Sequence, residues 1–574
     1  EAYKPSPDGR HVVYGLALGG SEKTTLHIVN VESGEQLPET IDRIETAYNS
    51  PNWLPDGSGF TYARRQQLPP GAPATEIYKN TKTYLHVLGV DPEDDQVVFG
   101  RGASRGVKLL DVDFPSIYIP TGSDYAIGKI KHGDNNEITL YTTLIRNLTQ
   151  AKIAWKKICD ASDEVEDYAV FGETIYLLTA RDAARYKVVK TSLARPNFAR
   201  AEIVLPESDM VILSVKSTED ALYADVLDGG FNRILRLEHG SSGPAGTLAL
   251  PNDAAGFVTT ASPDMKGILV YTSNWTKGSL IYAYDPDSKE YTDTGLLPQG
   301  AFDDVPGYVS REVHVESHDG VMVPLSILHK KGLRLDGTHP TLLTGYGSYG
   351  STSGAFFSAT RLAWLELGGV YAIAHVRGGG AYGKEWHLAG RMLNKPNTWK
   401  DFIACAEYLI EKRYTSRGRL AGQGGSAGGI TIGRAITERP DLFTAAIINN
   451  GLLDAVRAET TTNGVPNIKE FGTVTEKDAF RGLHAMSAYH HVKNGTAYPA
   501  VILTHGFNDP RVDPWMSAKM TARLLAATTS DKPVLFRVDY DAGHGIGSTR
   551  AQYLAQLADT WAFLLWQFRV EGFK

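Results

Sequence analysis

The sequence predicts an all-β domain of the propeller type followed by an α/β domain with a mostly parallel, doubly wound sheet. Three observations support this prediction. Residues 1–305 hold many short β-branched and aromatic runs, residues 306–574 alternate strand-like with helical runs, and one serine stands among glycines at a strand-to-helix junction. Short strands separated by turns are typical of all-β folds, whereas strand–helix alternation predicts a parallel sheet covered by helices. A chain of 574 residues is long enough for two such domains.

The first half consists of short runs with alternating apolar residues, such as HVVYGLAL at 11–18, TTLHIVNV at 24–31 and ETIYLLTA at 173–180. Turns of one kind recur before strands, at 6–9 (SPDG) and 54–57 (LPDG). Proline presets φ in such a turn, aspartate bonds back to the backbone and glycine accepts positive φ. Repeated units of a turn and strands indicate about six or seven propeller blades of roughly 40–50 residues, with a pair of β-sandwiches as the alternative.

The second half begins with strand-like runs at 311–317, 322–330, 341–347 and 369–376. The run at 398–413, TWKDFIACAEYLIEKR, repeats apolar residues with the helical period. Residues 551–568 are predicted to form a closing helix. This alternation predicts the parallel sheet.

Ser426 stands in Gly424-Gly425-Ser426-Ala427-Gly428, between the strand-like run RLAGQGG and a helical run that stops near Pro440. This matches the nucleophile-elbow pattern G-x-S-x-G, in which a strained turn exposes the hydroxyl above the sheet. Small neighbours let the adjacent backbones approach, and the following helix N-terminus offers N–H groups to an oxyanion. The motif predicts either a nucleophile or a tight turn, because glycines surround serines in many loops.

Two further residues favour the nucleophile. Asp509 follows the strand YPAVILTHG, and His544 follows the strand PVLFRVDYDAG. Active sites of open α/β sheets lie at such carboxyl ends of strands, and Ser–Asp–His is the chain order of α/β-hydrolase triads. The sequence therefore predicts an α/β-hydrolase domain with Ser426, Asp509 and His544 as its triad.

The motifs GGSAGG, NDPRV and AGHG around these residues resemble the prolyl oligopeptidase family of serine peptidases. So do LHKKGLRLDGTHP at 328–340, GYGSYG at 345–350 and ERPDLF at 438–443. The resemblance runs from about residue 310 to residue 574. It implies a propeller at 1–305, lacking its first blade and an N-terminal segment of the family, and an α/β-hydrolase catalytic domain at 306–574.

The resemblance also implies roles at the site. Ser426 matches the nucleophile, His544 the general base and Asp509 the residue that orients the imidazole. Tyr346 matches the tyrosine whose hydroxyl completes the oxyanion hole with the Ala427 N–H. Arg511 matches an arginine that holds a substrate carbonyl.

The specificity pocket departs from the family. Prolyl-specific members stack an aromatic on the substrate proline, and Asn467 aligns with that position. Other pocket positions align with Tyr349, Leu452, Phe471 and Val512, which are mainly apolar, and Glu470 matches the acidic cluster of dibasic-specific relatives. We therefore expect a serine peptidase that hydrolyses short or gated peptides. The alternatives are the same triad acting on an isopeptide bond such as that of a lasso peptide, an N-acyl amino acid or an ester, and a non-catalytic propeller binding module.

Composition limits the partners. A net charge of −7 gives no basic excess for nucleic acid or an anionic membrane, and no apolar run is long enough to span a bilayer. No motif indicates a metal or an organic cofactor, and Gly378–Gly380 lacks dinucleotide-binding spacing and is predicted to be a close-packed loop. Cys159 and Cys405 are predicted to be structural. We expect a peptide substrate admitted between the domains, a monomer or dimer, and a cytoplasmic protein, or a periplasmic one if a signal segment was removed.

Overall fold

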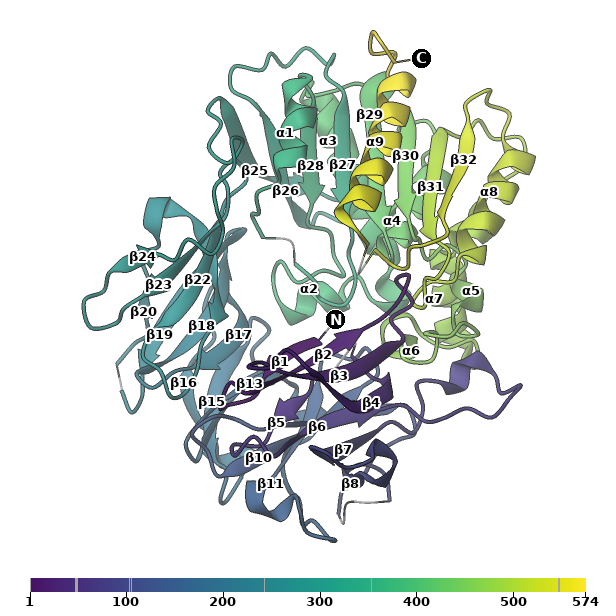
Figure 1. The fold of residues 1–574 in the computed structure, drawn as a ribbon. Coiled ribbons are helices and arrows are strands. Elements are labelled where there is room, and N and C mark those ends of the chain that lie inside the picture. Colours follow the sequence, from purple (N-terminus) through teal and green to yellow (C-terminus); the bar gives the residue numbers. More distant parts are fainter. Residues whose placement is uncertain are drawn as a thin grey trace.

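The N-terminal part of the structure, a computed structural model, consists of antiparallel sheets that follow one another along the chain (Figure 1). The structure describes residues 2–46, 50–102, 104, 106–241, 243–352, 354–545 and 548–573. The first sheet contains β1 (Ala2–Pro5), β2 (His11–Leu16), β3 (Thr24–Asn30), β4 (Gln36–Ile44), β5 (Asn52–Trp53), β6 (Gly59–Arg64), β7 (Lys82–Val87) and β8 (Gln96–Phe99). It comprises two four-stranded units, β1–β4 and β5–β8, joined where Ile44 pairs with Arg64.

Four four-stranded sheets follow, each built from consecutive strands. Their strands are β9 (Asp113–Tyr118), β10 (Tyr125–His132), β11 (Ile138–Leu144) and β12 (Lys156–Cys159), then β13 (Val165–Phe171), β14 (Thr174–Thr179), β15 (Lys187–Ser192) and β16 (Glu202–Leu205). The last two sheets hold β17 (Val211–Ser217), β18 (Ala221–Asp228), β19 (Phe231–Glu238) and β20 (Gly246–Thr247), then β21 (Ala255–Thr260), β22 (Ile268–Ser273), β23 (Leu280–Tyr284) and β24 (Tyr291–Asp293). Apolar side chains of neighbouring sheets share cores, as Leu178 of β14 and Leu222 of β18 do. Consecutive four-stranded sheets packed in this way form the predicted β-propeller.

The predicted turn chemistry explains how these strands begin. Before β2, the Ser6 hydroxyl donates to Asp8 at 2.6 Å and the Gly9 N–H donates to the Ser6 carbonyl at 3.0 Å. Gly9 has a φ of 71°, which a residue with a Cβ rarely adopts. The same chemistry recurs at Asp56 and Gly57 before β6, where Gly57 has a φ of 69°.

The C-terminal part forms an eight-stranded sheet in the order β25-β26-β28-β27-β29-β30-β31-β32. β26 pairs antiparallel with both of its neighbours, β25 and β28, and the remaining neighbours in the sheet pair parallel. The strands are β25 (Tyr308–Glu316), β26 (Met322–Lys330), β27 (Thr341–Gly345), β28 (Val370–Ala374), β29 (Leu420–Gly425), β30 (Ala445–Asn449), β31 (Ala500–Gly506) and β32 (Val534–Asp539). The helices are α1 (Ala359–Glu366), α2 (Lys384–Leu388), α3 (Pro396–Glu411), α4 (Gly428–Glu438), α5 (Ala455–Ala458), α6 (Ile468–Phe471), α7 (Lys477–Met486), α8 (Trp515–Ala527) and α9 (Arg550–Gln567).

Helices cover both faces of this sheet, as expected for the predicted α/β-hydrolase domain. Leu343 of β27 packs in the core that holds α3, α4 and α8, while its neighbour Leu342 packs in the core that holds α1 and α9. Successive strand residues point to opposite faces, so a strand between two helical layers is apolar throughout. Figure 1 shows α1 and α9 in front of the sheet and the propeller below it. Throughout the described ranges, no helix has the length and apolar character needed to cross a membrane.

Candidate active site

Ser426 occupies the sharp turn between β29 and α4. Its φ of 54° is uncommon for a residue with a side chain. Hydrogen bonds of 2.9 Å hold its backbone on both sides, from its N–H to the Asn449 carbonyl and from the Leu452 N–H to its carbonyl. A Cβ on Gly424 would lie 2.7 Å from the carbonyl oxygen of Gly428, so this motif position accepts only glycine. The local sequence thus produces the strained turn that exposes a hydroxyl.

Asp509 follows β31 and is held by donors on both carboxylate oxygens. Oδ1 accepts from the backbone N–H groups of Arg511 (2.8 Å) and Val512 (3.0 Å), and Oδ2 lies 2.6 Å from His544 Nδ1. Buried His505 places Nε2 3.3 Å from the same Oδ2. Burial acts to raise the pKa of Asp509, but the hydrogen bonds from His505 and His544 outweigh it and hold this pKa below its ordinary value. Asp509 is therefore a fixed, ionised acceptor.

The environment of His544 determines its proton arrangement. Nδ1 faces a carboxylate oxygen and must donate, which leaves Nε2 of the neutral ring as a base. His544 and Ser426 line the same cavity. In the described part of the chain no hydrogen bond joins the Ser426 hydroxyl to His544. Such contacts are often long in unliganded sites and shorten when substrate binds.

Tyr346 and Ala427 lie beside Ser426 on the same cavity. Burial raises the pKa of Tyr346 to about 12, and a hydrogen bond with Ser426 acts in the opposite direction. The phenol therefore keeps its proton at neutral pH and can donate. Ala427 is the N-cap of α4, so its N–H lies outside the hydrogen-bond ladder of the helix. The two donors are suited to an oxyanion at the serine.

The cavity has a volume of about 310 Å³ and lies between the two domains. Its hydrolase wall includes nine predicted residues: Tyr346, Tyr349, Ser426, Ala427, Leu452, Asn467, Arg511, Val512 and His544. Its propeller wall consists of residues that the sequence analysis did not identify, namely Glu22, Tyr78, Lys131, Asp134 and Asn136. Asp509 lies behind His544. The cavity is thus completed by a domain distant in sequence.

Asn467 aligns with the position at which prolyl-specific members of the family have an aromatic residue. Both polar atoms of its side chain are hydrogen-bonded within the protein. Its Oδ1 accepts a 2.6 Å hydrogen bond from the Tyr349 hydroxyl, and its Nδ2 donates to the Asn463 carbonyl at 2.7 Å. Leu452 and Val512 supply nearly buried apolar surface. The pocket beside Ser426 is accordingly part apolar and part polar, without a flat aromatic floor at residue 467.

Glu470 and Phe471 lie behind this wall instead of on it. Glu470 is 2% exposed, its Oε1 accepts from the Tyr349 N–H at 3.0 Å, and its Oε2 contacts His387 Nε2 at 2.8 Å. Phe471 is also 2% exposed and packs edge-on against the Tyr349 ring. In this arrangement Glu470 supports the loop that carries the pocket, whereas the sequence suggested a direct contact with a basic substrate. No sequence signal distinguished an internal carboxylate from an exposed one.

Lys395 is a fully buried cation that holds the same loop from another side. Its Nζ donates to the Gly347 carbonyl and the Ser348 hydroxyl, both at 2.5 Å, and lies 5.6 Å from the centre of the Phe471 ring. Burial lowers the pKa of Lys395 to about 8, and the charge of Glu470 opposes this effect. The lysine therefore remains mainly protonated at neutral pH. It fixes the two residues that follow Tyr346.

We expect Lys395→Met to lower the free energy of unfolding by about 3 kcal/mol, because it removes a buried cation whose charge interacts with Glu470, leaving the Arg391 contact at 3.9 Å, and it takes the donor away from two loop oxygens. Lys412→Met is the matched control, since Lys412 is half exposed, pairs with its neighbour Glu411 and lies 5.7 Å from the centre of the Tyr408 ring. The control should change stability by less than about 0.5 kcal/mol. Urea denaturation measures both. Equal effects of the two variants would contradict a supporting role for Lys395.

A propeller segment at 18–22 contacts both loops that carry the candidate acid and base. Glu22 forms a two-point ion pair with Arg511, with Nε–Oε1 at 2.8 Å and Nη2–Oε2 at 2.9 Å. A Cβ on Gly20 would lie 2.3 Å from the backbone nitrogen of Gly543, so the segment packs directly beside His544. Figure 1 shows this β2–β3 connection extending up to the hydrolase domain. Arg511 is thus oriented from across the domain interface.

The side chains offer little for a metal. Within the described ranges, no three His, Cys, Asp or Glu residues form a group that could hold an ion.

Two further predictions concern residues away from the cavity. Cys159 and Cys405 are free and buried. Gly378 has a φ of 94°, and a Cβ there would lie 2.1 Å from the Gly347 carbonyl oxygen, which confirms the predicted close-packed loop.

Comparison with known proteins covers nearly the whole chain. A profile of the "Prolyl oligopeptidase family" matches residues 355–571, and one of the "Prolyl oligopeptidase, N-terminal beta-propeller domain" matches residues 1–294. The prolyl endopeptidase of Elizabethkingia meningoseptica is 30% identical over 568 residues, covering 99% of this chain and 78% of that protein. The dipeptidyl aminopeptidase BI of Pseudoxanthomonas mexicana is 28% identical over 593 residues, covering 99% of this chain and 76% of that protein.

A solved structure gives the same result. It comes from a structural and mechanistic study of two prolyl endopeptidases, and it superposes with a TM-score of 0.91 at 30% identity. The match covers 100% of this chain and 82% of the other. Sequence and structure comparisons therefore agree on both halves of the molecule.

Proposed function

Because the chain belongs to the prolyl oligopeptidase family and is a serine peptidase, we propose that Ser426, Asp509 and His544 are its catalytic triad. One observation carries the proposal: His544 is bound to Asp509 at 2.6 Å on the cavity to which the strained Ser426 turn opens. This arrangement leaves Nε2 of His544 available to Ser426.

The mechanism that this geometry supports is acyl transfer. His544 Nε2 takes the proton of Ser426 as its oxygen attacks the peptide carbonyl, and Asp509 stabilises the resulting imidazolium. The Tyr346 hydroxyl and the Ala427 N–H donate to the oxyanion of the tetrahedral intermediate. His544 then protonates the leaving amine. Water then attacks the acyl carbon while His544 removes its proton, and His544 returns that proton to the Ser426 oxygen as the acyl–oxygen bond breaks and the acid is released.

We further propose that substrates are short peptides enclosed between the domains. The cavity measures about 310 Å³ and has a propeller wall, which leaves no room for a folded protein around the scissile bond. The propeller also donates directly to the pocket loop, since Asn136 Nδ2 bonds the Tyr349 carbonyl at 3.2 Å. Arg511, oriented by Glu22, has a guanidinium at the cavity that suits a substrate carbonyl.

The second candidate function keeps the triad and changes the substrate to an isopeptide, an N-acyl amino acid or an ester. The observation that favours it is Asn467, whose link to Tyr349 replaces an apolar stacking surface with an amide. Such a pocket offers a proline ring no aromatic face at this position, so cleavage after proline loses that source of selectivity.

Hydrolysis rates on a matched panel test the two functions. The panel contains short peptides that differ in the residue before the scissile bond, the ester and N-acyl counterparts of the best peptide, and the same sequence inside a folded protein. We expect the short peptides to be cleaved and the folded protein to resist. Turnover of esters or N-acyl amino acids without turnover of any peptide would overturn the primary proposal, and strong preference for cleavage after proline would exclude the second.

A further inference from the structure

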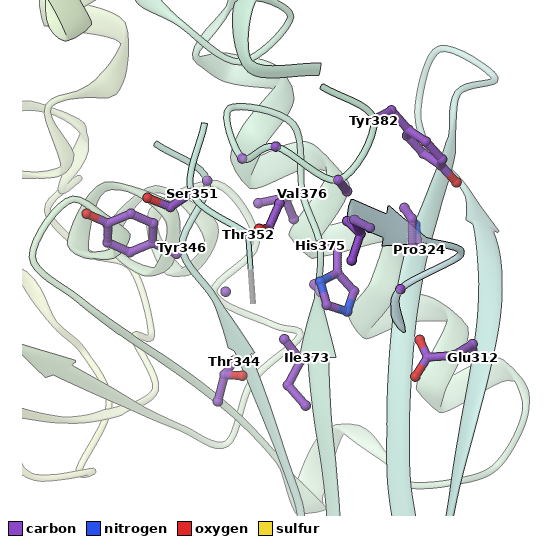
Figure 2. Close-up of a pocket in the computed structure, with 18 of the residues that line it drawn as sticks. Glu312, Pro324, Thr344, Tyr346, Ser351, Thr352, Ile373, His375, Val376 and Tyr382 are labelled. Carbon is purple, nitrogen blue, oxygen red and sulfur yellow. The ribbon is translucent and has the colours of Figure 1, made fainter. Parts of the chain in front are cut away.

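A second chamber, of about 330 Å³, shares Tyr346 with the catalytic cavity but is not lined by Ser426. It lies over the carboxyl ends of β27 and β28 and is closed from the propeller side by residues between Asp209 and Gly230. Figure 2 shows Tyr346 on one side of the chamber, His375 in the middle and Glu312 on the other side. Nothing in the proposed mechanism uses this space.

Most of the chamber wall is apolar. It is lined by aliphatic and aromatic side chains from both domains, including Val211, Leu227, Pro324, Ile373, Val376 and Tyr382. A wall of this kind with a few polar groups is typical of sites for small organic ligands. The wall suits a small aliphatic or aromatic body.

Besides neutral polar side chains, the chamber wall carries two carboxylates. Glu312 and Asp209 line it, whereas no lysine or arginine does among the described residues. Burial lowers the pKa of His375 to about 4, so its ring is neutral at physiological pH. The other histidine, His314, contacts the Tyr382 hydroxyl through Nε2 at 3.0 Å. Asp209 is paired with Arg185 at 3.2 Å, so an anionic ligand would be repelled mainly by the Glu312 carboxylate, beside which the described lining offers no lysine or arginine.

Glu312 lacks the cationic partner that other interface carboxylates have. It accepts from the Ser326 hydroxyl at 2.6 Å and from the Trp275 indole N–H at 3.2 Å, both of them neutral donors. Within the described chain it has no ion pair, whereas Glu22 pairs with Arg511 at 2.8 Å and Glu166 with Lys384 at 2.7 Å. Burial raises the pKa of Glu312, as expected for a carboxylate without a countercharge.

His375 presents a second acceptor. The Ser326 hydroxyl donates to Glu312, so it must accept from His375 Nε2, which lies 2.8 Å away. Nε2 therefore carries the ring proton, and Nδ1 is left as an acceptor. In the described part of the structure, Nδ1 has no hydrogen-bond partner. The chamber thus combines a carboxylate without a cation and a neutral nitrogen acceptor with an apolar wall.

We propose that this chamber binds a protonated primary amine on a small apolar or aromatic body, with Glu312 as its counter-ion. The ammonium group donates to Glu312 and to Nδ1 of His375, and the body lies against Val211 and Ile373. Two sources supply this chemistry: a free amine, or the amino terminus of a peptide that extends past Tyr346. This inference goes beyond the proposed function, because binding of an amine in the chamber can be measured without hydrolysis of any peptide at Ser426.

Titration calorimetry with the full chain tests the site, with phenethylamine as the probe. We expect saturable binding that is at least about tenfold tighter than that of 2-phenylethanol or 3-phenylpropionate, which carry the same ring without the positive charge. Glu312→Gln should weaken phenethylamine by about tenfold or more. Asp134→Asn, which removes a carboxylate from the catalytic cavity, is the matched control and should leave the affinity unchanged.

A second variant keeps the test valid if Glu312→Gln fails to fold. Ala381 is a partly exposed residue of the chamber wall, and Ala381→Phe should abolish phenethylamine binding by filling the space. Equal binding of 2-phenylethanol, undiminished binding by both variants, or no saturable binding would overturn the proposal.

Two peptides of the same sequence, one with a free and one with an N-acetylated amino terminus, distinguish the two sources of the amine. Both are titrated into Ser426→Ala protein. Tighter binding of the free peptide that depends on Glu312 identifies a substrate amino terminus. Equal binding of the two peptides, with phenethylamine still bound, identifies a free amine. Peptide hydrolysis by unsubstituted protein is measured in parallel, so failure of the amine site and failure of the peptidase assignment give different results.

Discussion

Ser426→Ala is expected to lower kcat for peptide hydrolysis by about four to six orders of magnitude, to the level that binding and the oxyanion donors sustain alone. The reason is local. The φ of 54° at residue 426 directs one hydroxyl toward the cavity that His544 lines, and alanine removes that oxygen while keeping the backbone turn. The loss of kcat is measured with the short peptide that the unsubstituted protein hydrolyses fastest, by a continuous assay and by an end-point assay for the slow variant.

The control for this variant is Ser351→Ala, which removes an exposed hydroxyl that lines the second chamber and not the catalytic cavity. Its kcat should stay within a factor of about two to three of the unsubstituted protein, since exposed substitutions away from a site have small effects. Near-normal activity of Ser426→Ala would reject Ser426 as the nucleophile.

Asp509→Asn is expected to lower kcat by about four orders of magnitude with little change in fold. An amide at this position can turn an N–H toward His544 Nδ1, which forces the ring proton onto Nε2 and removes the base. The backbone donors of Arg511 and Val512 can still bond the amide oxygen, so the loop should keep its shape. Steady-state kinetics and a thermal unfolding curve measure the two effects.

Asp513→Asn is the matched control in the same loop. Its carboxylate accepts from the Trp515 indole at 2.9 Å and does not contact His544. We expect kcat to stay within a factor of about three. Similar losses in the two aspartate variants would indicate disturbance of the loop and not loss of the acid.

The fold was predictable because each element has a local signal. The helix expected at 398–413 is α3 at Pro396–Glu411, which begins at a proline suited to the first turn. The helix expected after Ser426 is α4, which ends at Glu438 before Pro440. The closing helix is α9, and Thr549 caps it by a reciprocal pair of hydrogen bonds with Gln552.

The hydrolase side of the candidate site could also be predicted from the sequence, because the carboxyl ends of the strands of one parallel sheet meet at one edge. The structure brings Asp509 and His544 into contact although 35 residues separate them. His505 was missed, yet it had a signal: a histidine near the end of the mainly apolar run AVILTHG, in the same strand that positions Asp509.

The propeller side could not be predicted. Glu22 reaches Arg511 across 489 residues, and nothing in the short segment around Glu22 records that contact. The burial of Lys395 and Glu470 could not be predicted either, and Glu470 was assigned to the substrate pocket, because burial of a charge depends on partners supplied by other elements. Long-range ion pairs of this kind require the assembled domains.

Covalent labelling by a fluorophosphonate, followed by peptide mass spectrometry, tests whether Ser426 is the nucleophile. A serine activated by His544 beside two oxyanion donors should react stoichiometrically, with the added mass on the peptide that contains Ser426 and with parallel loss of peptide hydrolysis. Asp509→Asn protein should label much more slowly. Absence of label at residue 426, or full peptidase activity in protein labelled there, would show that Ser426 is not the nucleophile.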